Sequence, residues 1–453
     1  MSNYLVFASV AVMLLISSMS STAIAVAFPE ITSSFNTSIV LAGWVLSASL
    51  LATLTTAPLM GRASDSFGRK NTFIFFVLLF VAGSFFSAIA QNIYWLIIAR
   101  LVQGIGGGGF VPAATGIVAE AFPKYRQRSV GFIISIMTAG TVLGPNLGGW
   151  LTESFGWRSI FWFALPWTIV ILVGVIFLMK KDPRRESIKI DVTGAAVFAL
   201  SLGGIMVGIT MVGDGGKSTL WWIPGMSLAI VGAALLGLFI WYERRLEQPL
   251  IDVHLLGGKS FLAANVFNTI IGLSHAVTTF IPYYAVTIYG MSTLQSGLAV
   301  TPRSVGLLLS SLVTSFFLVR WGYRKPMLYG SAMLFVTSLL LGFAALEEIP
   351  YIGHIELSML LVIVGLSGIG MGITVPAANN ACIELMPQSI STITGLRQTF
   401  RNLGGVLGVA VTTIVLHNIG DDNGFAVIFV GSALLFLLGL PAIFSMPRSA
   451  CDV

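Results

Sequence analysis

Fourteen runs of mostly apolar residues, each long enough to cross a lipid bilayer, follow one another along this chain of 453 residues. A helix that spans the ~30 Å hydrocarbon core needs about 20 apolar residues. Inside that core every backbone N–H and C=O must be hydrogen-bonded within the protein, which favours helices. The sequence therefore predicts an all-α integral membrane protein with fourteen transmembrane helices. The predicted helices lie at residues 5–28, 42–60, 72–91, 94–119, 129–150, 160–180, 192–212, 222–242, 260–285, 296–319, 326–346, 357–383, 393–417 and 425–446.

Composition excludes most soluble classes. Hydrophobic residues make up 56% of the chain and charged residues only 9%, against roughly 25% charged in a soluble domain. The run at residues 5–28 is too long for the apolar core of a cleaved signal, so it is interpreted as a retained first span. The two cysteines, Cys382 and Cys451, do not form a disulfide framework or a metal-binding pattern. No phosphate-binding loop is present, so we expect no cofactor and no enzymatic activity.

Lysine and arginine placement predicts the orientation. Of 24 such residues, 18 fall in loops on one side of the predicted spans, and only Arg158 and Lys217 on the other. Cytoplasmic loops carry this excess, so both termini are expected in the cytoplasm, with the chain in the cell inner membrane. The basic pI of about 9.4 is then a signal of topology and does not indicate nucleic-acid binding.

An internal repeat relates the two ends of the chain. Residues 104–115 align without gaps on residues 368–379, and the same offset pairs Glu120 with Glu384. A weaker echo relates residues 65–70 to residues 319–325. Parallel halves with a binding site between them at mid-depth are a transporter architecture. We expect one six-helix half at 1–190, another at 260–453, and two additional helices with a linker at 191–259.

Three motifs carry a resemblance to a known family. Residues 61–70 (GRASDSFGRK), 100–106 (RLVQGIG) and 140–149 (GTVLGPNLGG) occur in this order, and the chain resembles the major facilitator superfamily, in particular its fourteen-helix drug:proton antiporter branch. The resemblance implies secondary active transport of a small molecule by alternating access, coupled to protons. We expect the protein to function as a monomer in the bilayer.

The first motif predicts a cytoplasmic gate. Asp65 is expected just ahead of the third helix, whose N-terminal dipole favours an anion, and the resemblance implies that this loop holds the two halves together when the site faces outward. The alternative is that Arg69 and Lys70 only fix the topology. Arg397 and Arg401 are candidate partners of Asp65 or Glu384. The predicted gate comprises Gly61, Asp65, Gly68, Arg69, Lys70, Arg397 and Arg401.

The third motif predicts close helix packing. Gly140, Gly144 and Gly148 recur every four residues and share one face, and small faces let helices approach closely in lipid. Pro145 removes a backbone donor. The resemblance implies a rocking hinge here, with simple close packing as the alternative. The predicted hinge and packing set is Gly140, Gly144, Pro145, Gly148 and Gly149.

One position departs from the family pattern. The branch usually has an acid in its first helix, and Ser20 occupies that place here. All 18 acidic residues fall in predicted loops, tails or helix ends, whereas the charges predicted inside spans are positive. An ionisable residue in the membrane is a functional candidate by default. These candidates are Arg100, Arg303, Arg397, Arg401 and the titratable His275.

The intramembrane candidates divide by role. The resemblance links Arg100 to proton coupling, and Glu120 joins it as a candidate. His275 suits a proton carrier or a structural histidine equally well. Arg303 is a candidate for substrate binding, or its side chain extends outward to the membrane surface. The candidates for the substrate cavity are Gln103, Asn265, Asn268, Arg303, Asn379 and Trp44. The alternative for the amide side chains among them is that they only join helices.

The sequence thus predicts an exporter of small amphipathic molecules, coupled to proton influx. A cationic interior favours anionic or neutral substrates over dications, because a charge without a counter-charge is costly in hydrocarbon. The alternative is an importer or facilitator of a metabolite anion, which the exporter-type motif at 140–149 disfavours. A receptor or lipid-handling scaffold is disfavoured because the transport motifs are intact.

Overall fold

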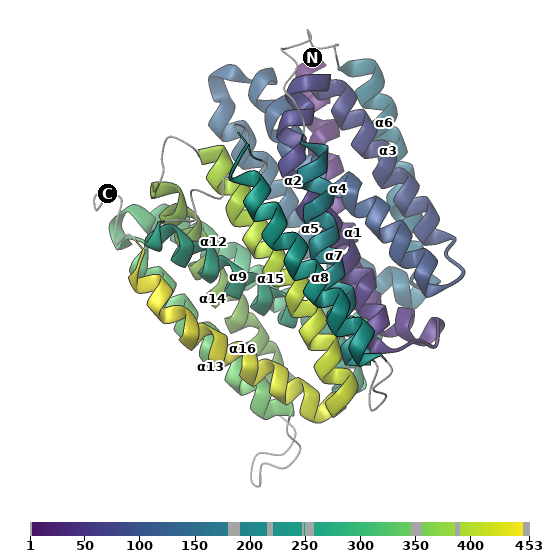
Figure 1. The fold of residues 1–453 in the computed structure, drawn as a ribbon, viewed down its shortest axis with the longest axis vertical. Coiled ribbons are helices and arrows are strands. Elements are labelled where there is room, and N and C mark those ends of the chain that lie inside the picture. Colours follow the sequence, from purple (N-terminus) through teal and green to yellow (C-terminus); the bar gives the residue numbers. More distant parts are fainter. Residues whose placement is uncertain are drawn as a thin grey trace. The chain divides into compact units, whose positions relative to one another are not determined.

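The computed structural model describes residues 2–179, 191–214, 221–246, 249, 258–345, 356–385 and 390–446. Within these ranges the chain is helical with short connections and contains no strand (Figure 1). The predicted loop residues Arg184, Lys217 and Cys451 lie outside them. The helices before the midpoint are α1 (Ser2–Ser34), α2 (Ile39–Phe67), α3 (Arg69–Ala88), α4 (Ile93–Ala121), the 3₁₀ turn η1 (Pro123–Tyr125), α5 (Arg126–Phe155), α6 (Ser159–Leu178), α7 (Val192–Asp214) and α8 (Trp222–Glu243).

The later helices include two spans that are broken. They are α9 (Lys259–Thr279), α10 (Ile281–Tyr289), α11 (Thr293–Ala299), α12 (Thr301–Trp321), α13 (Arg324–Ala345), α14 (Leu357–Glu384), α15 (Ile390–Ile419) and α16 (Asp421–Phe444). The single spans predicted at 260–285 and 296–319 are therefore the pairs α9–α10 and α11–α12. Pro282 and Pro302 directly follow the two breaks. Proline lacks the N–H that would continue the preceding helix, so each of these residues starts a new helix.

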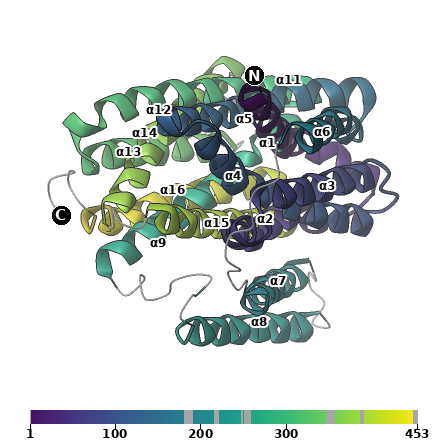
Figure 2. The ribbon, with the colours of Figure 1, turned by 90° about the horizontal axis from the view of Figure 1, so that it is seen from above.

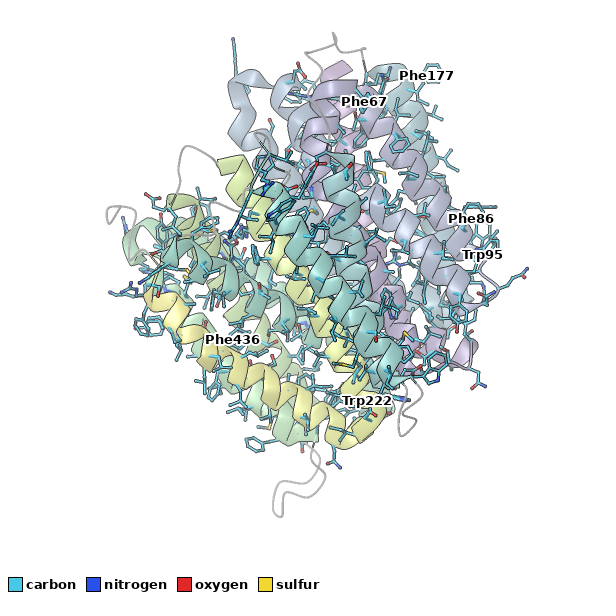
Figure 3. All side chains as sticks on the ribbon, in the orientation of Figure 1. Phe67, Phe86, Trp95, Phe177, Trp222 and Phe436 are labelled. Atoms are coloured by element: carbon cyan, nitrogen blue, oxygen red, sulfur yellow. The ribbon has the colours of Figure 1, made fainter. Side chains whose placement is uncertain are left out.

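The prediction of fourteen transmembrane helices is confirmed. Thirteen of the described spans are long and apolar enough to cross a membrane, and the remaining one, α5, is a more polar helix of 30 residues. Large apolar side chains are exposed along the helices, including Phe177 (82%) and Phe67 (65%), whereas Phe436 is buried (Figure 3). An apolar exterior of this kind suits lipid and not water.

The chain divides into two compact units, described separately below. Unit 1 comprises Met1–Gly208 and Pro224–Leu250, and unit 2 comprises Ile209–Ile223 and Ile251–Val453. The inserted helices α7 and α8 are shared between the units and lie side by side, with the backbones of Gly204 and Gly232 in contact (Figure 2).

The two units have the same helix packing. In unit 1, α1 packs on α5 and α6, α4 packs on α2 and α3, and α3 packs on α6. In unit 2, α9 packs on α15 and α16, α14 packs on α12 and α13, and α13 packs on α16 (Figure 1). Matching pairs in matching order confirm two pseudo-symmetric six-helix halves, as the internal repeat predicted.

Glycines bring the first and fifth helices of each unit into contact. A methyl group at Gly140 would meet the side chain of Ser18, and one at Gly144 would meet the side chain of Thr22. In unit 2, Gly404 and Gly408 lie at the same offset of 264 residues and approach the α9 backbone at Leu273. Backbone contact of this kind is what small residues provide between membrane helices.

The remaining glycines and the proline of the predicted hinge set are also buried. Gly148 packs against Ala23, Gly149 and Pro145 are buried, and α5 is helical throughout. Close helix packing, the alternative to a hinge, therefore accounts for the contacts that these residues make in the structure. The hinge implied by the resemblance stays a prediction.

Candidate functional site

The connection between α2 and α3 is much shorter than the predicted loop of residues 61–70. Helix α2 continues to Phe67, α3 begins at Arg69, and only Gly68 lies between them, with φ 86°. Because this left-handed region favours glycine, Gly68 makes the sharp turn possible. The expectation that Asp65 lies in a loop ahead of α3 was wrong, since Asp65 belongs to the last turn of α2. The side chain of Asp65 and the surroundings of Gly61 lie outside what the structure describes, so their gate role stays a prediction.

Arg69 and Lys70 tie α3 to its neighbours in unit 1. The Arg69 guanidinium donates to Glu120 Oε2 at 2.8 Å and also to the Gly116 carbonyl on α4. The Lys70 ammonium donates to the carbonyls of Ile176, at 2.6 Å, and Met179 at the end of α6. These cations bind carbonyls and a carboxylate that the helix C-termini present. Glu120, a proton-coupling candidate, is here a half-exposed partner of Arg69.

Unit 2 repeats this arrangement with different side chains. Gly322, with φ 70°, stands where unit 1 has Gly68, and Tyr323 donates its hydroxyl to Glu384 Oε2 at 3.2 Å. Arg324 donates to the carbonyl of Phe444, the last residue of α16, at 2.7 Å and to that of Met446, two residues later, at 2.8 Å. The sequence analysis did not assign a role to Tyr323 or Arg324, although the echo at 319–325 was the signal that could have identified them.

Arg100 is buried in unit 1, and its hydrogen bonds go to neutral groups. Its side chain donates to the Val45 carbonyl at 3.0 Å, to Ser49 Oγ at 2.8 Å and to Gln103 Oε1. Gln103 in turn donates to Ser84 Oγ at 2.8 Å. This network joins α4 to α2 and α3. Gln103, a cavity candidate, is only 2% exposed and holds Arg100 in place.

Basic side chains gather in unit 2, from three different helices. Arg303 is 8% exposed and donates Nη2 to Thr278 Oγ1 on α9 at 2.6 Å. The backbone of Arg401 on α15 packs against Gly272, three residues before His275 on α9. The buried Arg303 bond favours a side chain that stays within the bundle over one that extends outward. We call His275, Arg303 and Arg401 the basic cluster.

Two further candidates, Asn379 on α14 and Arg397 on α15, are in contact with each other. Arg397, 8% exposed, donates Nη1 to Asn379 Oδ1, and its charge is within reach of Arg401. Neither predicted gate arginine has a described hydrogen bond to Glu384. Arg397 is instead held by the amide that the sequence analysis assigned to the substrate cavity.

The asparagine candidates on α9 face their own helix. Asn265 and Asn268 are 0% and 1% exposed. Each donates its amide to the carbonyl four residues earlier, at Phe261 and Ala264, at 2.9 Å. Each of these amides therefore already uses one N–H within α9 and has fewer donors for a ligand. Trp44, the last cavity candidate, is partly exposed on α2.

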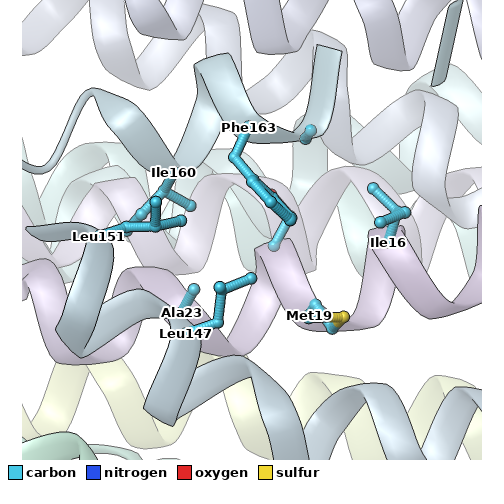
Figure 4. A pocket seen from close by; sticks show the side chains of 9 residues that line it. Ile16, Met19, Ala23, Leu147, Leu151, Ile160 and Phe163 are labelled. Atoms are coloured by element: carbon cyan, nitrogen blue, oxygen red, sulfur yellow. The ribbon is translucent and has the colours of Figure 1, made fainter. Parts of the chain in front are cut away.

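Ser20 lines a small apolar cavity inside unit 1 (Figure 4). Its side chain is 5% exposed, and its hydroxyl has no hydrogen-bond partner among the described residues. The place that usually holds the family's first-helix acid is therefore enclosed by hydrocarbon from three helices. The lining residues are Ile16, Met19, Ser20, Ala23, Leu147, Leu151, Ile160, Phe163 and Ala164.

Carboxylates in the described residues stay near helix ends. Each described aspartate and glutamate lies outside the helices or within five residues of a helix terminus. Glu243, the last residue of α8, is 1% exposed, so a position at a helix end does not always mean contact with water. Arg100, Arg397 and Arg401 lie further into their helices. The helix interiors that the structure describes therefore carry positive charge only.

Comparisons with known proteins agree with this architecture. The family model described as Major Facilitator Superfamily matches residues 10–409, with a second match over 261–450. Multidrug resistance protein 3 of Bacillus subtilis (strain 168) is 30% identical over 382 residues, which cover 83% of this chain and 72% of that protein. The Multidrug resistance protein B homolog of Mycobacterium tuberculosis (strain ATCC 25618 / H37Rv) is 29% identical over 401 residues, covering 87% of this chain and 73% of that protein.

Solved structures match over nearly the whole chain. The crystal structure of a D-xylose–proton symporter superposes with a TM-score of 0.66 at 15% identity, covering 96% of this chain and 98% of that one. The crystal structure of the human organic anion transporter MFSD10 (TETRAN) has a TM-score of 0.59 at 17% identity, covering 97% and 99%. At these identities the likeness concerns the fold.

Proposed function

Because this chain belongs to the major facilitator superfamily and is a transporter, not an enzyme, we propose that it exports small amphipathic molecules by alternating access, driven by proton influx. Anionic or neutral molecules are the favoured cargo, and dications are disfavoured. The export direction is supported by the relatives that carry the names of multidrug resistance proteins and by the glycine motif of α5.

One observation carries the charge preference. The described helix interiors contain Arg100, Arg397 and Arg401, and Arg303 is buried beside the break between α11 and α12, while the described carboxylates stay within five residues of helix ends. A cation that leaves water for such an interior would lose its hydration and find no opposite charge, which is costly in hydrocarbon. An anion would be attracted instead, and a neutral molecule would not be affected in this way.

The proton pathway is part of the same proposal. Ser20 cannot titrate, so the family's usual first-helix acid does not carry the proton here. His275 is the titratable member of the basic cluster and the leading candidate carrier. Arg100, with hydrogen bonds to three partners, is more suited to organising α2, α3 and α4 in unit 1.

Transport in everted membrane vesicles tests direction and coupling together. We expect an added substrate to enter the vesicles only when a proton gradient, acidic inside, is present, and to release protons from them as it enters. A His275→Ala variant should lose the pH dependence of the rate, and a variant that kept all of it would remove His275 from proton coupling. Accumulation by right-side-out vesicles and not by everted ones would contradict export.

A further inference from the structure

The basic cluster in unit 2 has buried polar atoms that make no hydrogen bond among the described residues. Arg303 Nε and His275 Nδ1 are buried and have no hydrogen-bond partner among the described residues. The Arg401 guanidinium makes no described hydrogen bond and is partly exposed. Buried polar groups in folded proteins are nearly always satisfied. A cluster with two positive charges and several unused donors therefore has the chemistry of a site that awaits an anion.

Helix α9 holds the three side chains near one another. The Thr278 hydroxyl accepts from Arg303 and donates to the carbonyl of His275 at 2.8 Å, which ties Arg303 to the turn that follows the imidazole. On the other side of His275, the backbone carbonyl of Arg401 lies against Gly272, where a methyl group would clash. Gly272 and Thr278 each lie three residues from His275, so the contacts of α9 with Arg401 and Arg303 flank His275 along the helix.

No described carboxylate neutralises this cluster. In unit 2 the acids whose side chains the structure describes are Asp214, Glu356, Glu384 and Asp421, all at helix termini or at the N-cap of a helix. Glu384 accepts from Tyr323, and Asp421 accepts from the Tyr283 hydroxyl at 3.4 Å. The other cation near the cluster, Arg397, adds to the positive charge.

We propose that His275, Arg303 and Arg401 bind the carboxylate group of an amphipathic cargo molecule. A carboxylate offers two oxygens with about four acceptor positions, and guanidinium groups recognise it with paired, charge-assisted hydrogen bonds. The apolar part of the cargo would lie against the helices around the cluster. The identity of the cargo as a transported molecule rests on the proposed function, whereas binding at the cluster does not.

Fluorescence titration of the purified full-length protein tests the site directly. The probe is dansyl-aminoundecanoate, and its uncharged methyl ester is the matched ligand without the carboxylate. We expect the carboxylate to bind the wild type at least about tenfold more tightly than the ester, since hydrogen bonds to charged groups are the stronger ones. Arg303→Gln and Arg401→Gln should each remove most of this preference and leave the affinity for the ester unchanged.

Controls separate the site from a loss of fold and from general charge. Arg320→Gln, at the exposed end of α12, should keep the full preference, and Arg303→Lys should keep part of it. The ester affinity reports in each variant whether the protein is folded. Equal affinity of the wild type for the carboxylate and its ester would overturn the proposal, and so would an equal loss in Arg320→Gln.

A lipid phosphate has the same anionic chemistry and is the other possible occupant. Titration in the presence of phosphatidylglycerol or phosphatidylcholine distinguishes the two. We expect neither lipid to displace the carboxylate probe, and full displacement by phosphatidylglycerol alone would overturn binding of a cargo carboxylate. Failure of this test would leave export itself open, because transport of a neutral molecule by vesicles is a separate result.

Discussion

Substitution of Gly144 by alanine is expected to destabilise the protein through the contact between α5 and α1. A methyl group there would lie 2.7 Å from the Met19 carbonyl oxygen and 3.1 Å from the Met19 Cα, and would overlap the Thr22 hydroxyl. Alanine in place of glycine favours a helix by about 0.5–1 kcal/mol, whereas overpacking costs about 1–3 kcal/mol. Because the obstacle is backbone, the cost should lie at the upper end, with a net loss of about 2 kcal/mol.

Gly431→Ala is the matched control, because Gly431 also lies within a membrane helix, α16, but has nothing within 4 Å of the added methyl group. This variant should gain the helix preference alone. Because the helix preference is the same in both variants, their difference should equal the overpacking cost, about 3 kcal/mol. Thermal unfolding of the detergent-solubilised proteins, followed by fluorescence-detected size-exclusion chromatography, should show a lower midpoint for Gly144→Ala and an unchanged or higher one for Gly431→Ala. Equal midpoints would refute the packing argument.

Three further substitutions test other parts of the structure. Arg100→Ala should lower stability by about 3 kcal/mol or more, since it removes three hydrogen bonds from a buried cation, and an unfolding midpoint equal to the wild type would contradict this network. Arg324→Ala should lower stability by about 1 kcal/mol, because it leaves the carbonyls at the end of α16 to water, and a loss as large as that of Arg100→Ala would be inconsistent with its exposure. Ser20→Asp, compared with Ser20→Asn, should increase ethidium export by everted vesicles, because it introduces a carboxylate beside the apolar cavity of unit 1; identical rates for the two variants would exclude charge as the reason.

The membrane helices could be predicted because lipid leaves few choices. Apolar length and the need for internal backbone hydrogen bonds determine where a span lies, so every predicted span corresponds to a helix or a broken helix. The breaks at Phe280 and Val300 were not predicted, although Pro282 and Pro302 were visible in the sequence. A proline in a membrane helix is often tolerated without a break, so the sequence does not distinguish the two outcomes.

Side-chain partners were less predictable than side-chain types. The buried positive residues were identified from their positions in apolar runs, but the partners depend on which helices pack together. Gln103 and Asn379 were assigned to a substrate cavity, and the structure shows them bound to Arg100 and Arg397. Tyr323 stands where the first repeat has Arg69. Its hydroxyl binds Glu384 as Arg69 binds Glu120, and a change of residue type hid this equivalence in the sequence.

Export rates for three probes of matched size, one anionic, one neutral and one dicationic, test the central claim most directly. The probes are an amphipathic carboxylate, its neutral ester and an amphipathic dication, each offered to the same everted vesicles under the same proton gradient. The account predicts export of the carboxylate and the ester at rates well above that of the dication, because the described helix interiors hold arginines without opposing carboxylates. Export of the dication at a rate equal to or above that of the carboxylate would contradict it.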